Sequence, residues 1–364
     1  MSAEQCQASH ENALLFSAMK KLYLSATKCY NMVINQDAKN QPMELIIDEE
    51  KRVQIAEEIV YLGDVFNNKG NNDGLVRDRV RRGTKAMISI NSIMAETDVG
   101  YHKISVSLLL YQSLFLSTML FNSQTWSKLR KKDIEKMKSI QLKLLKRMVG
   151  VAKSTCNAFL FLELGVLPIE FEIRKRQLMF LHRIVNLEAN DPVFCMFENL
   201  VRMNSEGETN WWTDVQKLLE MYIGKDVRGV KEMSKGEFRS LVNSSIEKAA
   251  LEELTTECKS KKKTSSLTYD SLKTQEYLKQ LYPNQARVLF KCRSQTLDLK
   301  SHSTYKYNDS VCRRCGQEDE TVEHVINCGH DEGIVLDYAD GNLNFSNTIR
   351  CVKRIESFID EVTS

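Results

Sequence analysis

Three cysteines and one histidine near the end of the chain have the types and spacing of a metal site. Cys312 and Cys315 are separated by two residues, and His324 and Cys328 follow with a separation of three, which gives the pattern C-x2-C-x8-H-x3-C. Two cysteines on a tight turn, with a His and a Cys on one helical turn, can supply four ligands to a tetrahedral zinc ion. Because four protein ligands leave no position for water, the predicted zinc is structural and not catalytic.

Neighbouring residues refine this prediction. Gly316 directly follows the second cysteine and suits the sharp backbone reversal that such a turn needs. His330 is an alternative fourth ligand, although H-x3-C fits one helical turn better than C-x-H. Glu323 is expected to orient the imidazole of His324 by a hydrogen bond. We expect the site to hold together a small C-terminal module that does not fold without its metal.

Basic side chains lie on the polar faces of consecutive predicted helices. In the helix expected at 131–149, apolar residues occupy one side and basic residues the other. One basic face is most often only solvated, but several in succession match the footprint of a protein that follows a phosphate backbone. The candidate nucleic-acid contacts are Arg77, Arg81, Lys85, Lys132, Lys136, Lys143, Lys146, Arg147, Arg174 and Lys175, with Arg313 and Arg314 beside the metal ligands.

The composition is that of a globular protein. With 364 residues, 42% hydrophobic and 27% charged, the chain can bury a full core and form two or three domains. Only 4 prolines and 15 glycines favour long helices over many-stranded sheets. The start of the chain lacks a signal-peptide pattern, and the ten cysteines are interpreted as reduced thiols. We therefore expect an intracellular protein, nuclear or cytoplasmic and not secreted.

The order of patterns predicts a mainly α fold with a small β region at its start. Short apolar runs at 29–35, 43–47 and 59–66 are typical of strands, and a turn-rich segment follows at 67–74. The apolar stretch 104–121 is interrupted by polar residues, so it is expected to be a core helix and no membrane partner is predicted. A helix with Val76 to Met94 on one stripe is expected to begin near Leu75, and further helices are expected at about 103–126, 131–149, 168–187, 235–260 and 348–362.

Four parts follow from these patterns. They are a mixed region with short strands at 1–74, a helical domain at 75–203, a helical linker region at 204–266 and a C-terminal zinc-binding module at 267–364. The segment 204–236 is polar and broken by glycines, which indicates a linker or hinge, and the lysine-rich stretch 259–266 indicates a flexible connector.

No catalytic constellation accompanies the metal pattern. The sequence has no phosphate-binding Walker loop, no G-x-S-x-G and no H-E-x-x-H. Tyr338-Ala339-Asp340 shares three residues with the Tyr-Ala-Asp-Asp of polymerase palms, but Gly341 stands where the second Asp would be, so a loop without catalytic role is expected. Trp211 and Trp212 could stack on bases, but a place in the core is the favoured interpretation.

Several segments resemble the region that follows the catalytic palm in LINE-type (non-LTR) retrotransposon reverse transcriptases. These segments are Lys28-Cys29, Tyr61-Leu62-Gly63-Asp64 with Gly70, Arg79 with its helix, Phe121 to Trp126, Leu162 to Ile169, Asp191-Pro192-Val193, and Cys312 to Gly316 with Glu320-Thr321 and His324. The resemblance implies a palm end with a primer-grip-like hairpin at Tyr61, Leu62 and Gly63. It also implies a helical thumb and a C-terminal zinc-binding region.

The same resemblance implies partners and a missing activity. By this resemblance, the helical thumb and the zinc-binding region would bind RNA or a template–primer duplex, including an RNA–DNA duplex. Members of the family place their catalytic aspartate pair upstream of these segments, and polymerisation needs such carboxylates to hold two magnesium ions. Mg²⁺ is thus expected only if that palm were present, and we predict a truncated reverse-transcriptase remnant that binds nucleic acid without polymerising alone. The alternatives are a domesticated nucleic-acid-binding protein, a zinc-stapled helical scaffold without nucleic-acid role, and a product without stable fold.

Overall fold

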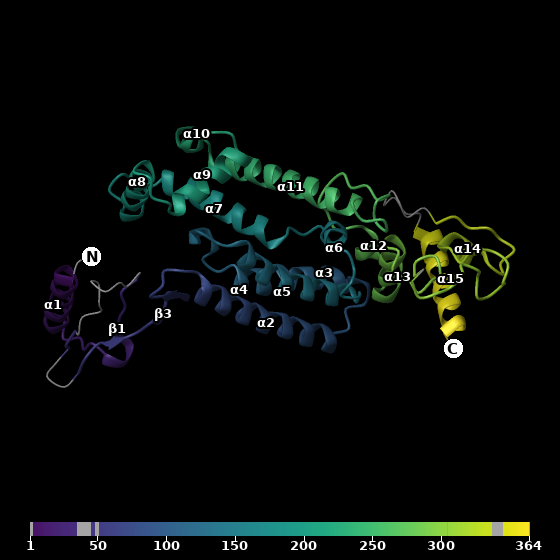
Figure 1. The fold of residues 1–364 in the computed structure, drawn as a ribbon, viewed down its shortest axis with the longest axis horizontal. Helices are drawn as coiled ribbons and strands as arrows, with labels where there is room; N and C mark the ends of the chain where they lie inside the picture. The colour runs from purple at the N-terminus through teal and green to yellow at the C-terminus, as the bar shows by residue number, and fades with distance from the viewer. Residues whose placement is uncertain (1–2, 35–44, 48–50, 304, 337–344, 364) are drawn as a thin grey trace. The chain divides into compact units, whose positions relative to one another are not determined.

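The computed structural model describes residues 3–34, 45–47, 51–303, 305–336 and 345–363, and it is mainly helical (Figure 1). The predicted fold class is confirmed, because strands occur in the described residues only near the start of the chain. Contacts between backbone positions divide the chain into two compact units. The first comprises residues 1–81 and 129–133, and the second comprises 82–128 and 134–364. The division into four parts stays a prediction.

The β region of the first unit consists of two small sheets. After α1 (Ala3–Met19), β1 (Tyr30–Asn31) pairs in parallel with β2 (Gln54–Ile55), and β3 (Glu58–Tyr61) pairs in antiparallel with β4 (Asp64–Asn67). The run predicted as one strand at 59–66 is therefore a hairpin. Its two turn residues, Leu62 and Gly63, have φ of 49° and 87°. Two positive φ values in a two-residue turn match the right-handed twist of the flanking strands.

The other two predicted strands are described only in part. The run at 29–35 contributes just β1 among its described residues. Of the run at 43–47, only 45–47 is described, and Ile46 there forms an isolated antiparallel bridge with Arg52.

A buried ion pair ties the hairpin to α2 (Asp73–Glu96). The side chain of Arg79 is 1% exposed and donates to the carboxylate of Asp64 and, at 2.8 Å, to the carbonyl oxygen of Gly63. On the exposed side of the same helix, Arg77 pairs with Glu58 of β3 at 2.7 Å. A buried arginine without a counter-ion would be strongly destabilising, so Arg79 fixes the turn of the hairpin against the helix.

The second unit begins with helices that the sequence largely predicts. The helix expected at 103–126 consists of α3 (Lys103–Leu110), the π-helical η3 (Tyr111–Leu116) and α4 (Ser117–Met119), followed by the 3-10 turn η4 (Ser123–Thr125). The predicted bounds of α5 (Lys131–Val149) are confirmed, and Gly150 ends it with φ of 76°. Next come α6 (Asn157–Leu164) and α7 (Ile169–Val185).

The segment 204–236, predicted as a linker or hinge, is folded into the core of this unit. The chain forms α8 (Pro192–Ser205), α9 (Trp211–Tyr222), α10 (Val227–Glu232) and α11 (Lys235–Lys259). Trp211 and Trp212 belong to a hydrophobic cluster with residues of α7, α8 and α11, as their core interpretation predicts. Capping boxes at Asn210 and Ser234 start α9 and α11, which offsets the polar composition that suggested a linker.

Four more helices lie in the described residues of the final part of the chain. They are α12 (Tyr277–Gln280), α13 (Pro283–Arg293), α14 (Val322–Asn327) and α15 (Phe345–Thr363), and α15 packs against both α13 and α14. The stretch predicted as a flexible connector is held in place, because Lys263 donates to the carbonyl oxygens of Gln295 and His302 at 3.0 and 2.6 Å. Residues 338–340 lie outside the described residues. No described helix has the length and apolar content needed to cross a bilayer.

Candidate metal centre and nucleic-acid interface

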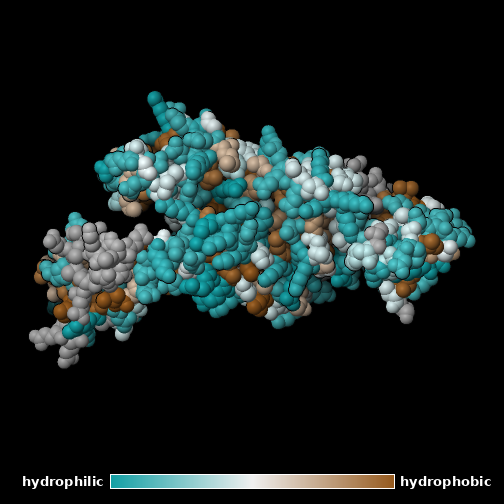
Figure 2. All heavy atoms as spheres, in the orientation of Figure 1, coloured by the Kyte–Doolittle hydropathy of each residue, from teal (hydrophilic) through white to brown (hydrophobic). Residues whose placement is uncertain are grey.

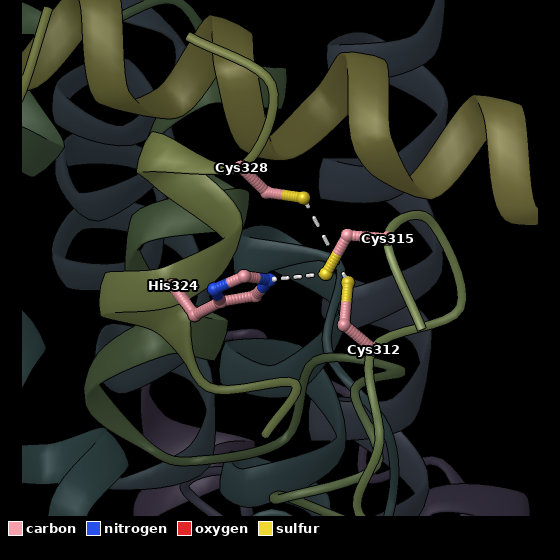
Figure 3. A group of neighbouring side chains, drawn as sticks. All are labelled: Cys312, Cys315, His324 and Cys328. Atoms are coloured by element: carbon pink, nitrogen blue, oxygen red, sulfur yellow. Dashed lines mark hydrogen bonds between the residues drawn. The ribbon is translucent and has the colours of Figure 1, made fainter. Parts of the chain in front are cut away.

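The four predicted ligands converge on one point (Figure 3). Their Sγ and ring nitrogen atoms all lie within 4.8 Å of one another. The sulfurs of Cys312 and Cys328 are 3.9 Å apart, and Sγ of Cys315 is 3.4 Å from Nε2 of His324. A tetrahedral zinc ion with ordinary bond lengths separates two sulfurs by about 3.8 Å and a sulfur from a nitrogen by about 3.6 Å. The arrangement is geometrically compatible with zinc.

Local structure explains how the ligands come together. Cys312 and Cys315 lie on a turn that Gly316 completes with φ of 68°, and the amide of Gly316 donates to the carbonyl of Cys312 at 2.9 Å. His324 lies on α14, and Cys328 directly follows the last residue of that helix. The side chain of Thr321 accepts from the amide of His324 and caps the helix. His330, the alternative ligand, does not belong to the cluster among the described residues.

A carboxylate orients the histidine, but it is not the predicted one. Nδ1 of His324 lies 2.9 Å from Oε2 of Glu318, whereas the sequence suggested Glu323. The prediction of Glu323 was wrong because it assumed a partner on the same helical turn, while the loop after Gly316 brings Glu318 to the ring. With Nδ1 donating to a carboxylate, the lone pair of Nε2 faces the sulfurs, as a metal-binding imidazole requires.

The environment also favours an anionic ligand at Cys315. Backbone N–H groups of Glu318 and Gln317 lower the pKa of the Cys315 thiol to about 6. Cysteines bind metals as thiolates, so the loop stabilises Cys315 in the form that binds a metal.

Arg313 and Arg314 are occupied within the metal module. Arg313 donates to both oxygens of the buried Glu320 and, at 2.6 Å, to the carbonyl of Asp298. Arg314 pairs with Glu361 of α15 at 2.6 Å and donates to the carbonyl of Cys328. Their side chains are only 19% and 17% exposed. Their nucleic-acid contacts stay a prediction that this geometry does not favour.

The clearest basic surface is the polar stripe of α5. Lys132, Lys136, Lys143 and Arg147 are all exposed, and no ion pair with another described residue involves them. Successive steps of 4, 7 and 4 residues keep them on one side of a helix. The opposite side is buried through residues such as Met137 and Leu144. This is the division that the sequence predicted for the helix.

The remaining candidate cations differ in whether their side chains already have an ion-pair or hydrogen-bond partner. Lys85 is exposed and Lys175 half-buried, and neither forms an ion pair with another described residue. Arg77 and Arg81 pair with Glu58 and Asp78. Lys146 donates to the carbonyl of Lys153 at 2.6 Å, and Arg174 donates to the hydroxyl of Tyr222 at 2.8 Å. The predicted contacts therefore do not form one continuous set.

The primer-grip-like residues form the turn between β3 and β4. Tyr61 and Leu62 are 61% and 73% exposed, and Gly63 accepts the hydrogen bond from Arg79. Arg79 holds this turn in place and leaves Tyr61 and Leu62 accessible to a partner. Their role stays a prediction.

Sequence reasoning missed the carboxylate of Glu318 and a second group of cations on α11. Glu318 lies between the two pairs of ligands, where spacing offers no signal for a hydrogen bond. The α11 cations Lys235 and Arg239 lie one turn apart at the start of the helix predicted at 235–260, but two cations by themselves do not distinguish a binding face from a solvated one.

Comparison of the chain with protein-family models, with curated proteins and with solved structures finds no match. The visible face in Figure 2 is mostly hydrophilic, with hydrophobic residues in separate patches. The metal cluster and the basic surfaces are the features of the chain that bear on function.

Proposed function

We propose that this protein binds nucleic acid, either RNA or a template–primer duplex, through the basic stripe of α5. The observation that carries the proposal is the row of exposed cations without ion-pair partners among the described residues, Lys132, Lys136, Lys143 and Arg147. A lysine or arginine that replaces counterions at a phosphate gains free energy from their release. Cations already paired with carboxylates gain less, which is why α5 is preferred over Arg77 and Arg81.

The length of the stripe suits a phosphate backbone. Fifteen residues separate Lys132 from Arg147, which corresponds to about 22 Å along the helix axis. One strand of a duplex carries a phosphate about every 3.4 Å of axis, so several phosphates lie within reach of the stripe. The stripe carries no exposed aromatic residue that would read bases, so binding with little sequence preference is expected.

Zinc has a structural part in this proposal. Cys312, Cys315, His324 and Cys328 would hold the ion, and its binding free energy would stabilise the C-terminal module. No position is left for substrate or water at the ion. The module would then be a folded unit attached to the helices that bind the nucleic acid.

The proposal includes the family that the sequence resembles. We propose that the chain corresponds to the thumb and zinc-binding region of a LINE-type reverse transcriptase and that it acts in the nucleus or cytoplasm. Support comes from the quoted segments, from the exposed hairpin turn at Tyr61, Leu62 and Gly63, and from cysteines that are free thiols among the described residues.

The experiment compares two charge-reversal variants of the zinc-loaded protein. One carries Lys136→Glu, Lys143→Glu and Arg147→Glu on the stripe. The control carries Lys217→Glu, Lys248→Glu and Lys259→Glu, three exposed lysines of α9 and α11. Both lose the same net charge, so a difference between them reports position and not total charge.

For both variants, the affinity for a 20-base-pair RNA–DNA duplex is measured at a series of salt concentrations. The stripe variant is expected to lose at least tenfold in affinity, and its slope of log affinity against log salt is expected to flatten by about three. Equal binding by the two variants would leave α5 as a solvated face. The zinc-stapled scaffold would then be the better account of the protein.

A further inference from the structure

A second basic surface lies in a groove between α7 and the start of α11, apart from the stripe of α5. The groove has a volume of about 820 Å³. Its α7 side includes Lys175, His182 and Arg183, and its α11 side includes Lys235 and Arg239. Lys175 precedes His182 by seven residues, and Lys235 precedes Arg239 by four, so each of these pairs lies on one helical face.

The groove is lined by positive charge, although Glu172 interacts electrostatically with Lys175 from outside it. Four cations line it, Lys175, Arg183, Lys235 and Arg239, and no aspartate or glutamate does. None of the four forms an ion pair with another described residue. Nearby carboxylates have other roles: Glu237 accepts from the amide of Ser234 in the capping box, and Glu172 precedes Lys175 by one turn of α7 without lining the groove.

The start of α11 also suits an anion. The groove includes Ser234 and Lys235, the N-cap and first residue of the 25-residue helix α11. Unsatisfied N–H groups and the helix dipole at such an end favour negative charge. His182 is held away from a ligand role, because its Nε2 lies 2.9 Å from the carbonyl of Met233 and its ring stacks on Phe238.

We propose that this groove binds the phosphodiester backbone of single-stranded nucleic acid. Lys175 and Arg183 are eight residues apart, about 12 Å along α7, so the charge extends over more than one phosphate group. A cavity of this size is in the range that holds a small ligand or a short length of strand, and a duplex is too wide for it. No Phe, Tyr or Trp lines the groove, so the contacts are with phosphates and binding is independent of base sequence.

This inference rests on the proposed nucleic-acid function and adds a second site to it. The α5 stripe would contact duplex, and the α7/α11 groove would hold a strand that has left the duplex. The two sites use different residues, so each can be removed without the other.

The test uses the full zinc-loaded chain with the variant Arg183→Gln, Lys235→Gln and Arg239→Gln. All three side chains are exposed, so the fold should be retained, and circular dichroism checks this. The control carries Lys217→Gln, Lys248→Gln and Lys259→Gln. Fluorescein-labelled oligouridylate and oligothymidylate of twelve residues are the single-stranded probes, and the 20-base-pair duplex is the third.

The groove variant is expected to bind both single strands at least tenfold more weakly than the control. Its slope of log affinity against log salt concentration should be shallower by about two. Each phosphate contact to a single strand contributes about 0.7 to this slope, and the variant removes three such contacts. Its duplex affinity should remain within twofold of the control. A loss confined to oligouridylate would also support the groove and would assign it to RNA.

Equal single-strand binding by the two variants would overturn the groove as a site. Binding of duplex without binding of either single strand by the unmodified protein would overturn the groove and leave the α5 proposal standing. Binding of none of the three probes would overturn both. The outcomes for the two sites are therefore distinguishable.

Discussion

Glu163 of α6 and Arg293 of α13 form an ion pair inside the protein, with Nη2 of Arg293 donating to Oε1 at 2.9 Å. Their side chains are 0% and 1% exposed. The hydroxyls of Tyr269 and Tyr277 donate to the same carboxylate, each at 2.5 Å. Because every oxygen of the buried carboxylate has a donor, the pair connects segments 130 residues apart at low cost.

Replacing Glu163 by glutamine tests this connection. Glutamine keeps the size of the side chain but leaves the buried Arg293 without a counter-ion, so the free energy of unfolding should fall by about 3–5 kcal/mol. Urea denaturation followed by circular dichroism measures it. Glu252→Gln, at an exposed position of α11, is the control and should change stability by less than about 0.5 kcal/mol. The double variant Glu163→Gln with Arg293→Met removes the unpaired charge and keeps an acceptor for the two hydroxyls, so it should recover part of the loss, and failure of Glu163→Gln to destabilise would contradict this account.

Replacing Cys312 by serine tests the metal centre. Serine offers a poor ligand in place of a buried thiolate, so stoichiometric zinc should be lost and the module around α14 and α15 should become sensitive to protease. Metal content by mass spectrometry and limited proteolysis are the measurements. Cys195→Ser, at an exposed position outside the cluster, should retain one zinc per chain. A Cys312→Ser protein that still held one zinc would refute this set of ligands.

Two glutamates near His324 give a sharper test of the geometry. Glu318→Gln removes the carboxylate at Nδ1 of His324, and loss of such a partner typically weakens metal affinity by 10–100-fold. Glu323→Gln should leave the affinity within about threefold. Competition with a zinc chelator measures both. A larger loss of affinity for Glu323→Gln than for Glu318→Gln would show that Glu323, as the sequence spacing suggested, is the partner of His324.

The parts of the fold that the sequence predicts are those with local signals. The bounds of α5 follow from its apolar period and Gly150, and the four metal ligands follow from short spacings. The roles of Arg313 and Arg314 could not be predicted, because the partner of Arg314, Glu361, is 47 residues away. The same holds for Glu163, whose partners lie more than 100 residues later.

The linker prediction for 204–236 was wrong because it relied on composition, whereas the fold of this segment is determined by the packing of a few side chains. The residues 204–236 are polar with several glycines, but Trp211, Trp212 and Val230 among them enter the core against α7 and α11. Val215 and Leu219 of the same segment are buried in this cluster too, and an average over a sequence window does not show that a few well-placed apolar side chains are enough to dock two short helices. The resemblance to LINE-type reverse transcriptases is a different kind of inference, and it stays a prediction.

His302 should make the protein sensitive to mild acid. Burial, and secondarily the charge of Lys263, lower the pKa of His302 to about 4 from 6.5. Between these values the unfolded chain takes up a proton that the folded protein does not, so stability should fall as the pH falls from about 6.5 to 4. The contribution is about 2–3 kcal/mol at most. Protonation of the metal ligands acts in the same range, so the informative quantity is a difference between variants.

The comparison is between the unmodified protein, His302→Gln and the control His102→Gln, which changes an exposed histidine. Urea unfolding is measured at pH 7 and pH 5 with equal zinc. His302→Gln should lose less stability on acidification than the other two proteins, because its side chain has no proton to bind. Equal losses in all three would mean that His302 titrates normally in the folded protein and that acid acts elsewhere.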